Sequence, residues 1–176
     1  MKKFVAGLVL CFAVQCLAQQ GQKQTPPTLK SILLQQLRET HNEKNWFVSA
    51  KEAAGGITAE QAAWSDGKNH SVGQLVHHLA FWNAQTLAQF KGEKPEQPKN
   101  NDETFQFDPK QWNATVEHFD DVMTQLENFV GSADDATLAK IAPTVARISQ
   151  HNAYHIGEIV MVRKAQGSWN PENGVK

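Results

Sequence analysis

The feature that most constrains the fold of this chain is a helical period of apolar residues in four long stretches. Apolar side chains recur there every three or four positions, as on a helix that buries one face. In one stretch these residues are Val72, Leu75, Val76, Leu79, Trp82, Leu87 and Phe90. No segment alternates as a strand would. Four amphipathic helices of about 20 residues make a bundle, so the sequence predicts an all-α four-helix bundle with short connecting helices.

Start and stop signals give the predicted helix boundaries. Polar N-cap residues favour helix starts, and glycine favours helix ends. The pair Ser71 and Gln74 has the spacing of a capping box, and Asp108-Pro109 is a strong start signal. The polar segment 92–107 is expected to be either a lid or a crossover. The predicted long helices are 28–53, 71–91, 109–130 and 143–166, with short helices at 58–64 and 134–141.

The first 18 residues have the composition of a secretory signal peptide. Two lysines precede an apolar run, Phe4 to Leu17, and small residues lead to Ala18. The run is too short for a stable membrane span. A lipoprotein signal is disfavoured because the residues before the two cysteines, Leu10 and Gln15, are not small. We therefore expect cleavage after Ala18, export to the periplasm or the medium, a flexible lead at 19–27, and a bundle domain at 28–176.

Composition limits the chemistry and the partners of the exported chain. Both cysteines, Cys11 and Cys16, lie in the predicted signal peptide, so disulfides, thiolate ligands and a cysteine nucleophile are excluded. A metal site would have to use histidine, carboxylate and water. The net charge is −1, from 17 basic and 18 acidic residues, and no basic cluster stands out. No nucleic-acid partner is expected.

Two histidines in the last predicted helix have the spacing of a metal-ligand pair. His151 and His155 are four residues apart and therefore lie one above the other on one helix face. Imidazole suits zinc, nickel, copper or iron. His155 falls near the centre of the apolar stripe of this helix, and His151 falls at its edge. Glu158 lies beyond His151 on the same edge.

A third ligand is expected from two adjacent histidines in the helix at 71–91. With a step of roughly 100° per residue, His78 lies about 60° from Leu75, at the flank of the buried stripe. By the same step His77 lies about 160° from Leu75 and should face water. The prediction is that His78 joins His151 and His155 around one metal ion, while His77 does not.

The remaining candidates have less specific signals. Glu158 is a candidate catalytic base for a metal-bound water or an acceptor that orients a histidine, and a solvated carboxylate is as plausible. His41 is expected to be a hydrogen-bonded core or rim residue and not a fourth ligand. His70 is expected in a solvated turn near the mouth of the site, and His118 on an exposed face. Packing is the expected role of the large aromatic residues Trp64, Phe81, Trp82, Trp112 and Trp169.

The two histidine segments together resemble a known family. Ser-Val-Gly-Gln-Leu-Val-His-His-Leu at 71–79 and His-Asn-Ala-Tyr-His-Ile-Gly-Glu-Ile at 151–159 are similar to the DinB/YfiT-like superfamily of metalloenzymes. The resemblance covers the chain from about residue 28. It implies a four-helix bundle with one divalent metal ion held by His78, His151 and His155.

Relatives in this superfamily include thiol-dependent S-transferases and maleylpyruvate-isomerase-like enzymes, and many are homodimers. The resemblance therefore implies a small-molecule substrate or a thiol as partner, and it allows a homodimer. The sequence departs from the family pattern in its export signal, which puts a cytosolic thiol cosubstrate in doubt. It also has Glu158 where the family commonly has glutamine.

Two classes of function follow. The first is an exported metal-dependent transferase or hydrolase, since three histidines leave a coordination position open. The second is a non-catalytic exported bundle that binds a metal or a small ligand. An open cleft at the metal face would favour the enzyme, and a site closed by side chains would favour the binding protein. The metal remains open among zinc, nickel, iron and manganese.

Overall fold

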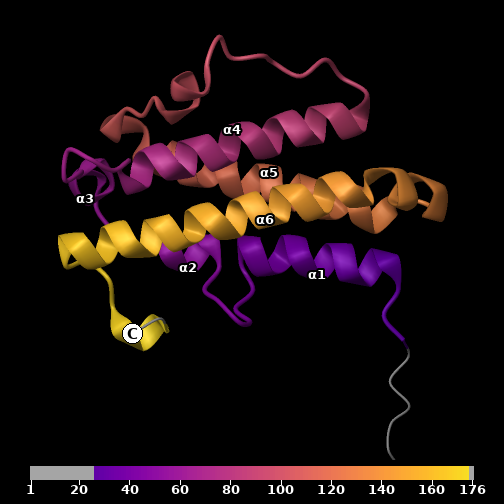
Figure 1. Ribbon diagram of the computed structural model, residues 1–176, viewed down its shortest axis with the longest axis horizontal. Helices are drawn as coiled ribbons and strands as arrows, with labels where there is room; N and C mark the ends of the chain where they lie inside the picture. The colour runs from indigo at the N-terminus through magenta and orange to yellow at the C-terminus, as the bar shows by residue number, and fades with distance from the viewer. Residues whose placement is uncertain (1–25, 175–176) are drawn as a thin grey trace, which may run out of the picture.

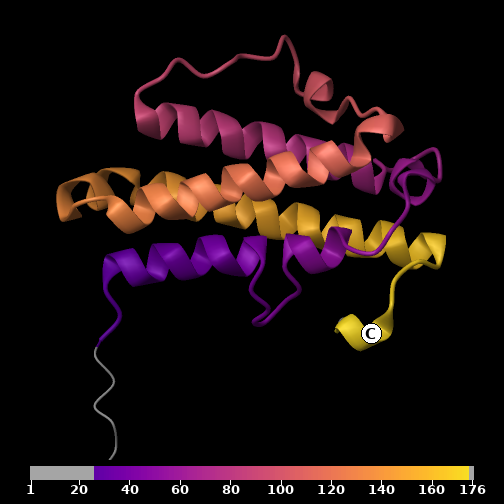
Figure 2. The same cartoon turned by 180° about the vertical axis from the view of Figure 1, so that it is seen from behind.

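The computed structural model describes residues 26–174 and shows a four-helix bundle in that range (Figures 1 and 2). The predicted signal peptide and most of the predicted lead lie outside the described residues. The described part of the chain is all-α, as predicted. Its long helices are α1 (Leu29–His41), α4 (Val72–Lys91), α5 (Trp112–Ser132) and α6 (Asp135–Gln166). The short elements are α2 (Ala50–Ala54), α3 (Ala59–Ala63) and the 3₁₀ turns η1 (Asn101–Phe105), η2 (Pro109–Gln111) and η3 (Pro171–Asn173).

The long helices lie side by side, with α4 and α1 each packed against both α5 and α6. Figure 1 shows that α1 and α6 run in one direction and α4 and α5 in the other. The segment 92–108 therefore returns along the bundle from the end of α4 to the start of α5. The crossover interpretation of this segment is confirmed. None of the helices in residues 26–174 is long and apolar enough to cross a bilayer.

The ends of α4 and α6 follow the sequence signals. The Ser71 hydroxyl accepts a hydrogen bond from the backbone N–H of Gln74 at 3.2 Å, and the Gln74 side chain accepts one from the Ser71 N–H at 2.8 Å. Gly92 and Gly167 end α4 and α6 in the left-handed conformation, with φ of 75° and 78°. These boundaries agree with the predicted 71–91 and with the predicted end at 166.

The predicted first helix, 28–53, is wrong, because the structure divides it into α1 and α2. The helix ends at His41, where Asn42 leaves the helical region with φ −141°. Ser49 then caps α2 through a hydrogen bond from the Glu52 N–H at 3.4 Å. Residues 42–46 are exposed, whereas Phe47 is half-buried and Val48 is buried. A helix without a buried face gains no packing energy, so the polar stretch after His41 does not continue the helix.

The predicted boundary at Pro143 is also wrong. The short helix at 134–141 and the last helix are one continuous helix, α6, which Asp134 caps by accepting from the Thr137 N–H at 2.8 Å. Pro143 lies inside α6 and lacks the N–H that would bond to the carbonyl of Ala139. Burial of Leu138 and Ile141 on one side of the proline and Val145 on the other holds both halves against the core.

A buried amide pair joins α4 to α6 within the apolar core. Asn83 and Asn152 are both 0 % exposed. The Asn83 amide donates to Asn152 Oδ1 at 2.8 Å, and the Asn152 amide donates to Asn83 Oδ1 at 3.1 Å. Buried amides are costly without partners, so this exchange favours one axial position of α4 against α6.

The crossover is fixed to the first turn of α4 by a close contact. Gly73 has no side chain, and the ring of Phe107 occupies the space where one would be. A Cβ atom on Gly73 would lie 2.2 Å from Cε1 of that ring. This approach brings η1 against α4 beside the adjacent histidines.

Candidate metal centre

Three histidines from two helices converge at one point, as predicted. His78 comes from α4, and His151 and His155 come from consecutive turns of α6. The Nε2 atom of His151 lies 3.1 Å from Nε2 of His78 and 3.1 Å from Nε2 of His155. One ring nitrogen of each histidine lies within 4.8 Å of the other two, which is a spacing suited to a single metal ion.

Burial keeps two of these imidazoles neutral. Burial, together with the charges of His155 and His151, lowers the pKa of His78 to about 3. Burial and the charge of His155 lower the pKa of His151 to about 4, although Glu158 acts in the opposite direction. Both rings are therefore unprotonated at neutral pH. A neutral imidazole offers a metal its lone pair without first losing a proton.

The protonation of His78 is set by Thr104 on η1. The Thr104 hydroxyl donates its proton to the carbonyl of Asn101 at 2.6 Å. The same oxygen lies 2.6 Å from Nδ1 of His78 and has no second proton to donate, so it accepts from Nδ1–H. The lone pair of neutral His78 is then on Nε2, which points toward the other two histidines.

Glu158 sets the protonation of His155 in the same way. Its Oε2 lies 2.6 Å from Nδ1 of His155. An ionised carboxylate only accepts hydrogen bonds, so Nδ1 carries the proton and Nε2 has the lone pair. The structure therefore places Glu158 as an acceptor that orients a histidine, one of the two roles considered from the sequence. Nδ1 of His151 is buried and has no hydrogen-bond partner within residues 26–174.

The geometry of the three nitrogens fits a small divalent cation. Zinc binds imidazole nitrogen at about 2.0–2.1 Å in tetrahedral sites, so neighbouring ligand nitrogens lie about 3.3–3.4 Å apart. The observed 3.1 Å is within a few tenths of an ångström of this separation. Three imidazoles leave a fourth position for water or substrate.

A stack of three rings covers one side of the centre. The ring of Phe105 lies parallel to that of His78, with centroids 4.0 Å apart. Its other face stacks on His70, with centroids 3.8 Å apart. His70 is exposed in the turn before α4 and so lies near the mouth of the site, as expected, but its contact is with Phe105.

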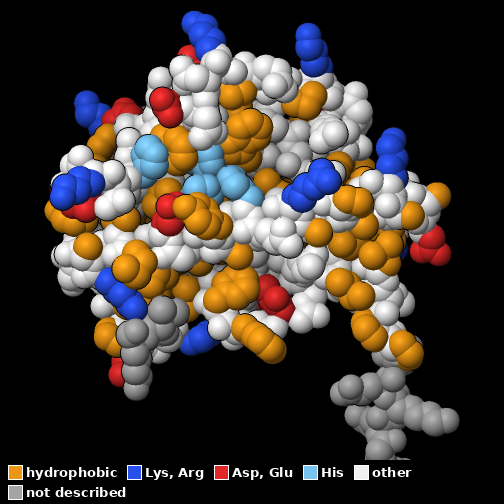
Figure 3. Space-filling model, viewed as in Figure 1, with side chains coloured by type: hydrophobic (Ala, Val, Ile, Leu, Met, Phe, Trp, Pro, Cys, Tyr) orange, Lys and Arg blue, Asp and Glu red, His pale blue; other side chains and the backbone are white. Residues whose placement is uncertain are grey.

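An open cleft, here called the histidine cleft, has the three histidines in its wall. Its volume is about 440 Å³. Figure 3 shows the histidine side chains reaching the surface beside a group of hydrophobic side chains. The apolar lining residues are Trp82, Phe105 and Ile148, and the polar ones besides the histidines are Thr86, Asn101, Thr144 and Arg147.

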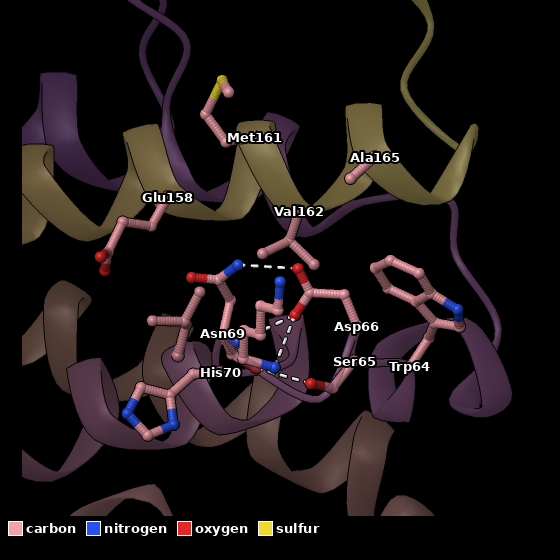
Figure 4. A pocket seen from close by; sticks show the side chains of 11 residues that line it. Trp64, Ser65, Asp66, Asn69, His70, Glu158, Met161, Val162 and Ala165 are labelled. Carbon is pink, nitrogen blue, oxygen red and sulfur yellow. Dashed lines mark hydrogen bonds between the residues drawn. The ribbon is translucent and has the colours of Figure 1, made fainter.

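A second cleft, here called the loop cleft, lies between the turn 64–70 and α6 and has a volume of about 400 Å³ (Figure 4). Its lining includes Asp66, Lys68 and Asn69 from the turn and Met161 from α6. Glu158 lines this cleft while its carboxylate holds His155. One side chain therefore links the loop cleft to the metal centre.

The other histidines lie away from the point of convergence. His77 was expected to face water, and this is wrong: it is half-buried, with Nδ1 2.8 Å from the carbonyl of Thr104. The crossover segment covers the face of α4 that a helical wheel leaves open. His118 is exposed, as expected. His41 is buried between Asp120 and Glu127, at 2.8 and 2.7 Å, so its hydrogen-bonded core role is confirmed.

Sequence reasoning missed Thr104 and Phe105. Both come from the segment 92–107, which was expected to be a lid or a crossover but has no helical period to show which of its side chains face the bundle. The only available signal was a Thr-Phe pair, followed two residues later by Phe107, at the end of a mostly polar stretch. Such a pair indicates an anchor to the core, but not which histidine it would meet.

The fold and the site together define a class: helical bundles with a three-histidine centre between two helices. The family model of the DinB superfamily matches residues 48–159, a segment that contains all three histidines and Thr104. The chain belongs to the DinB superfamily. Comparison with curated proteins gives no significant match, and neither does comparison with solved structures.

Proposed function

We propose that His78, His151 and His155 bind one divalent metal ion and that the protein is a metal-dependent enzyme acting on a small molecule. The observation that carries this proposal is the meeting of three Nε2 atoms in the wall of an open cleft. The volume of about 440 Å³ falls in the range of small-molecule sites, roughly 300–1,000 Å³. Because the cleft reaches the histidines, the geometry supports the enzyme over a purely binding role.

A bound metal ion would supply a Lewis acid at the open coordination position, suited to a thiol, water or carbonyl group. The residues around it have separate tasks. Thr104 and Glu158 fix the two ligand tautomers. Phe105 and Trp82 restrict the access of water on the α4 side. Glu158 can hold His155 with one oxygen and accept a proton from a group in the loop cleft with the other. Transfer and hydrolysis both fit this arrangement.

We also propose that the protein is exported. The support is the basic start, the apolar run and the small residues up to Ala18. Mass spectrometry of the protein from its native host should give an amino terminus near Gln19. An uncleaved chain in the cytosol, or a lipidated terminus at Cys16, would contradict this proposal.

Metal analysis of protein purified without an affinity tag tests the proposed function. We expect about one metal ion per chain, as one three-histidine site holds. His78→Ala should abolish metal binding, whereas the adjacent His77→Ala should leave the stoichiometry unchanged. Equal losses from both variants, or a native protein that takes up no divalent metal, would overturn the proposal. The loaded protein would then be screened with thiol and ester substrates.

A further inference from the structure

We infer that the histidine cleft takes a small organic acid with an apolar body, and that Arg147 holds its carboxylate. This inference rests on the proposed function, since it places the reacting end of the acid at the metal ion. It goes further by assigning a substrate class and a residue that selects it.

Arg147 lies on α6 one turn before His151, and it lines the same cleft. At a rise of 1.5 Å per residue, its Cα is about 6 Å along the helix axis from that of His151. An anion bound by its guanidinium would therefore lie near the metal centre without occupying it. This separation fits a compact acid with one group at Arg147 and another at the three histidines.

Arg147 differs from the other two arginines of the chain in having no structural partner. Arg38 pairs with Glu127 at 3.4 Å, and Arg163 is buried against backbone carbonyls, including that of Ala53 at 2.7 Å. Arg147 makes no side-chain hydrogen bond or ion pair with any residue in 26–174. Positions three and four before and after it carry no acidic residue, so no salt bridge along α6 accounts for it.

The rest of the lining also favours an acid. No carboxylate lines the histidine cleft. Asn101 and Thr144 line it with side chains that donate no hydrogen bond to the described part of the chain, so both remain available to a ligand. Trp82 and Ile148 offer an apolar surface for the body of the acid. A guanidinium recognises a carboxylate through two parallel hydrogen bonds, which fixes the orientation of the ligand.

The loop cleft is the competing location, and its charge argues against it. Lys68 lines this cleft, but so do the carboxylates of Asp66 and Glu158. Backbone hydrogen bonds from Lys68 and Asn69 lower the pKa of Asp66, which keeps it negative at neutral pH. An acid placed there would meet two carboxylates, whereas an acid in the histidine cleft meets none.

The test measures the binding of phenylacetate to the full mature chain by calorimetry or NMR titration. Phenylacetamide serves as the uncharged isostere. Both probes are applied to the metal-free and to the zinc-loaded protein. We expect phenylacetate to bind both forms. Phenylacetamide should bind at least about tenfold more weakly, since a charged hydrogen-bond pair is lost. Arg147→Gln should lower phenylacetate affinity about tenfold or more, and Arg147→Lys by less. Zinc affinity should be unchanged in both variants.

The matched control is Lys140→Gln, which removes the same charge from an exposed position two turns earlier on α6 and outside the cleft. It should leave phenylacetate affinity unchanged. Three results would overturn the inference: equal affinity in wild type and Arg147→Gln, no measurable binding of phenylacetate, or a loss with Lys68→Gln in place of Arg147→Gln. The last result would place the acid in the loop cleft.

The two proposals fail separately in this experiment. If zinc does not bind but phenylacetate binding depends on Arg147, the metal-enzyme proposal is wrong and the acid site stands. The opposite result is that zinc binds, while phenylacetate binds only the zinc-loaded protein and with the same affinity in Arg147→Gln. In that case the inference is wrong and the proposed metal site stands.

Discussion

At the residue scale, Thr104 contributes no metal ligand, yet it fixes the state of His78. Its one proton is donated to the Asn101 carbonyl, so its oxygen must accept from Nδ1–H of His78. Without this acceptor, His78 could exchange its proton between the two nitrogens and rotate. Groups that orient metal-binding histidines in this way typically affect metal affinity 10- to about 100-fold.

Thr104→Val should therefore weaken zinc binding about 10- to 100-fold while the bundle stays folded. Valine keeps the shape of threonine but offers Nδ1–H no acceptor. Competition with a chromophoric chelator measures the affinity, and circular dichroism checks the fold. Thr115→Val, which removes the hydrogen bond from another buried threonine to the Gln111 carbonyl, is the control. Similar zinc affinities in the two variants would show that Thr104 does not orient His78.

His41 is a second residue whose protonation the structure determines. Burial lowers its pKa, but hydrogen bonds and charges from Glu127 and Asp120 outweigh burial and raise it above the usual 6.5. Both carboxylates only accept, so both ring nitrogens must donate, which requires the protonated ring. Arg38 also faces Glu127 at 3.4 Å, and Lys51 lines a small cavity that His41 and Asp120 line as well.

The free energy of unfolding should therefore fall as the pH rises above about 7.5, about one unit above the usual histidine pKa. In that range the folded state holds a proton on His41 that the unfolded state has released, so the slope is negative, at most about 1.4 kcal/mol per pH unit. The contribution is complete below pH 6.5 and is lost as the pH passes the raised pKa. His78 and His151 are neutral in the folded state but still partly protonated in the unfolded state near pH 6.5, so they add an opposing slope there, which has largely vanished by about pH 7.5. Urea unfolding of metal-free protein from neutral to mildly alkaline pH measures this slope.

His41→Gln should abolish this pH dependence, whereas His118→Gln, which changes an exposed histidine of α5, should keep it. A slope that survives in His41→Gln would assign the effect to another group.

The sequence was sufficient to predict the three histidines that converge but not the residues around them. His78 could be distinguished from His77 because the apolar stripe of a long helix fixes its rotation. Thr104 and Phe105 could not be predicted, because they reach the site from a crossover without a period. For the same reason it could not be predicted that the crossover would cover His77.

At the element scale, the convergence of the three histidines depends on how α4 lies against α6. His78 is five residues before Asn83 on α4, and His151 is next to Asn152 on α6. The amide exchange between Asn83 and Asn152 therefore fixes the two helices close to the point where their histidines meet. An apolar contact would allow sliding that two directional hydrogen bonds do not.

Asn83→Leu should destabilise the bundle by about 1–3 kcal/mol, since Asn152 is left buried without its partner. The double variant Asn83→Leu/Asn152→Leu should recover part of this loss, because no amide is then unpaired. Both variants should bind zinc more weakly than wild type. Urea unfolding and zinc competition are the measurements. If the double variant binds zinc as tightly as wild type, the pair supports the fold but does not position the histidines.

Helix boundaries were predictable where a cap and an apolar stripe agree, as at Ser71 and Gly92. They were not predictable where packing opposes a local signal. The helix predicted at 28–53 is interrupted after His41 because its polar middle has nothing to bury. The helix α6 continues through Pro143 because buried residues on both sides outweigh one missing hydrogen bond.

At the scale of the whole molecule, the bundle should fold independently of the proposed metal site. All four long helices bury apolar residues, and fully buried ones include Leu37, Leu79, Leu126 and Ile159. The three histidines lie at one edge of this core, with His151 half-buried and a cleft open beside it. Burial of apolar surface is the dominant favourable term in folding, so the fold should not require the metal ion.

His155→Ala should therefore abolish zinc binding while keeping nearly all of the helical circular dichroism. Zinc that binds only the folded state stabilises it by mass action, by about 2.7 kcal/mol at a free concentration 100 times Kd. Zinc should accordingly raise the melting temperature of the wild type and leave that of His155→Ala unchanged. Without metal, the two proteins should melt within a few degrees of each other, apart from the effect of the lost contact between His155 and Glu158. A metal-free wild type that is unfolded at room temperature would make the site a structural one, and the enzyme proposal would lose its main support.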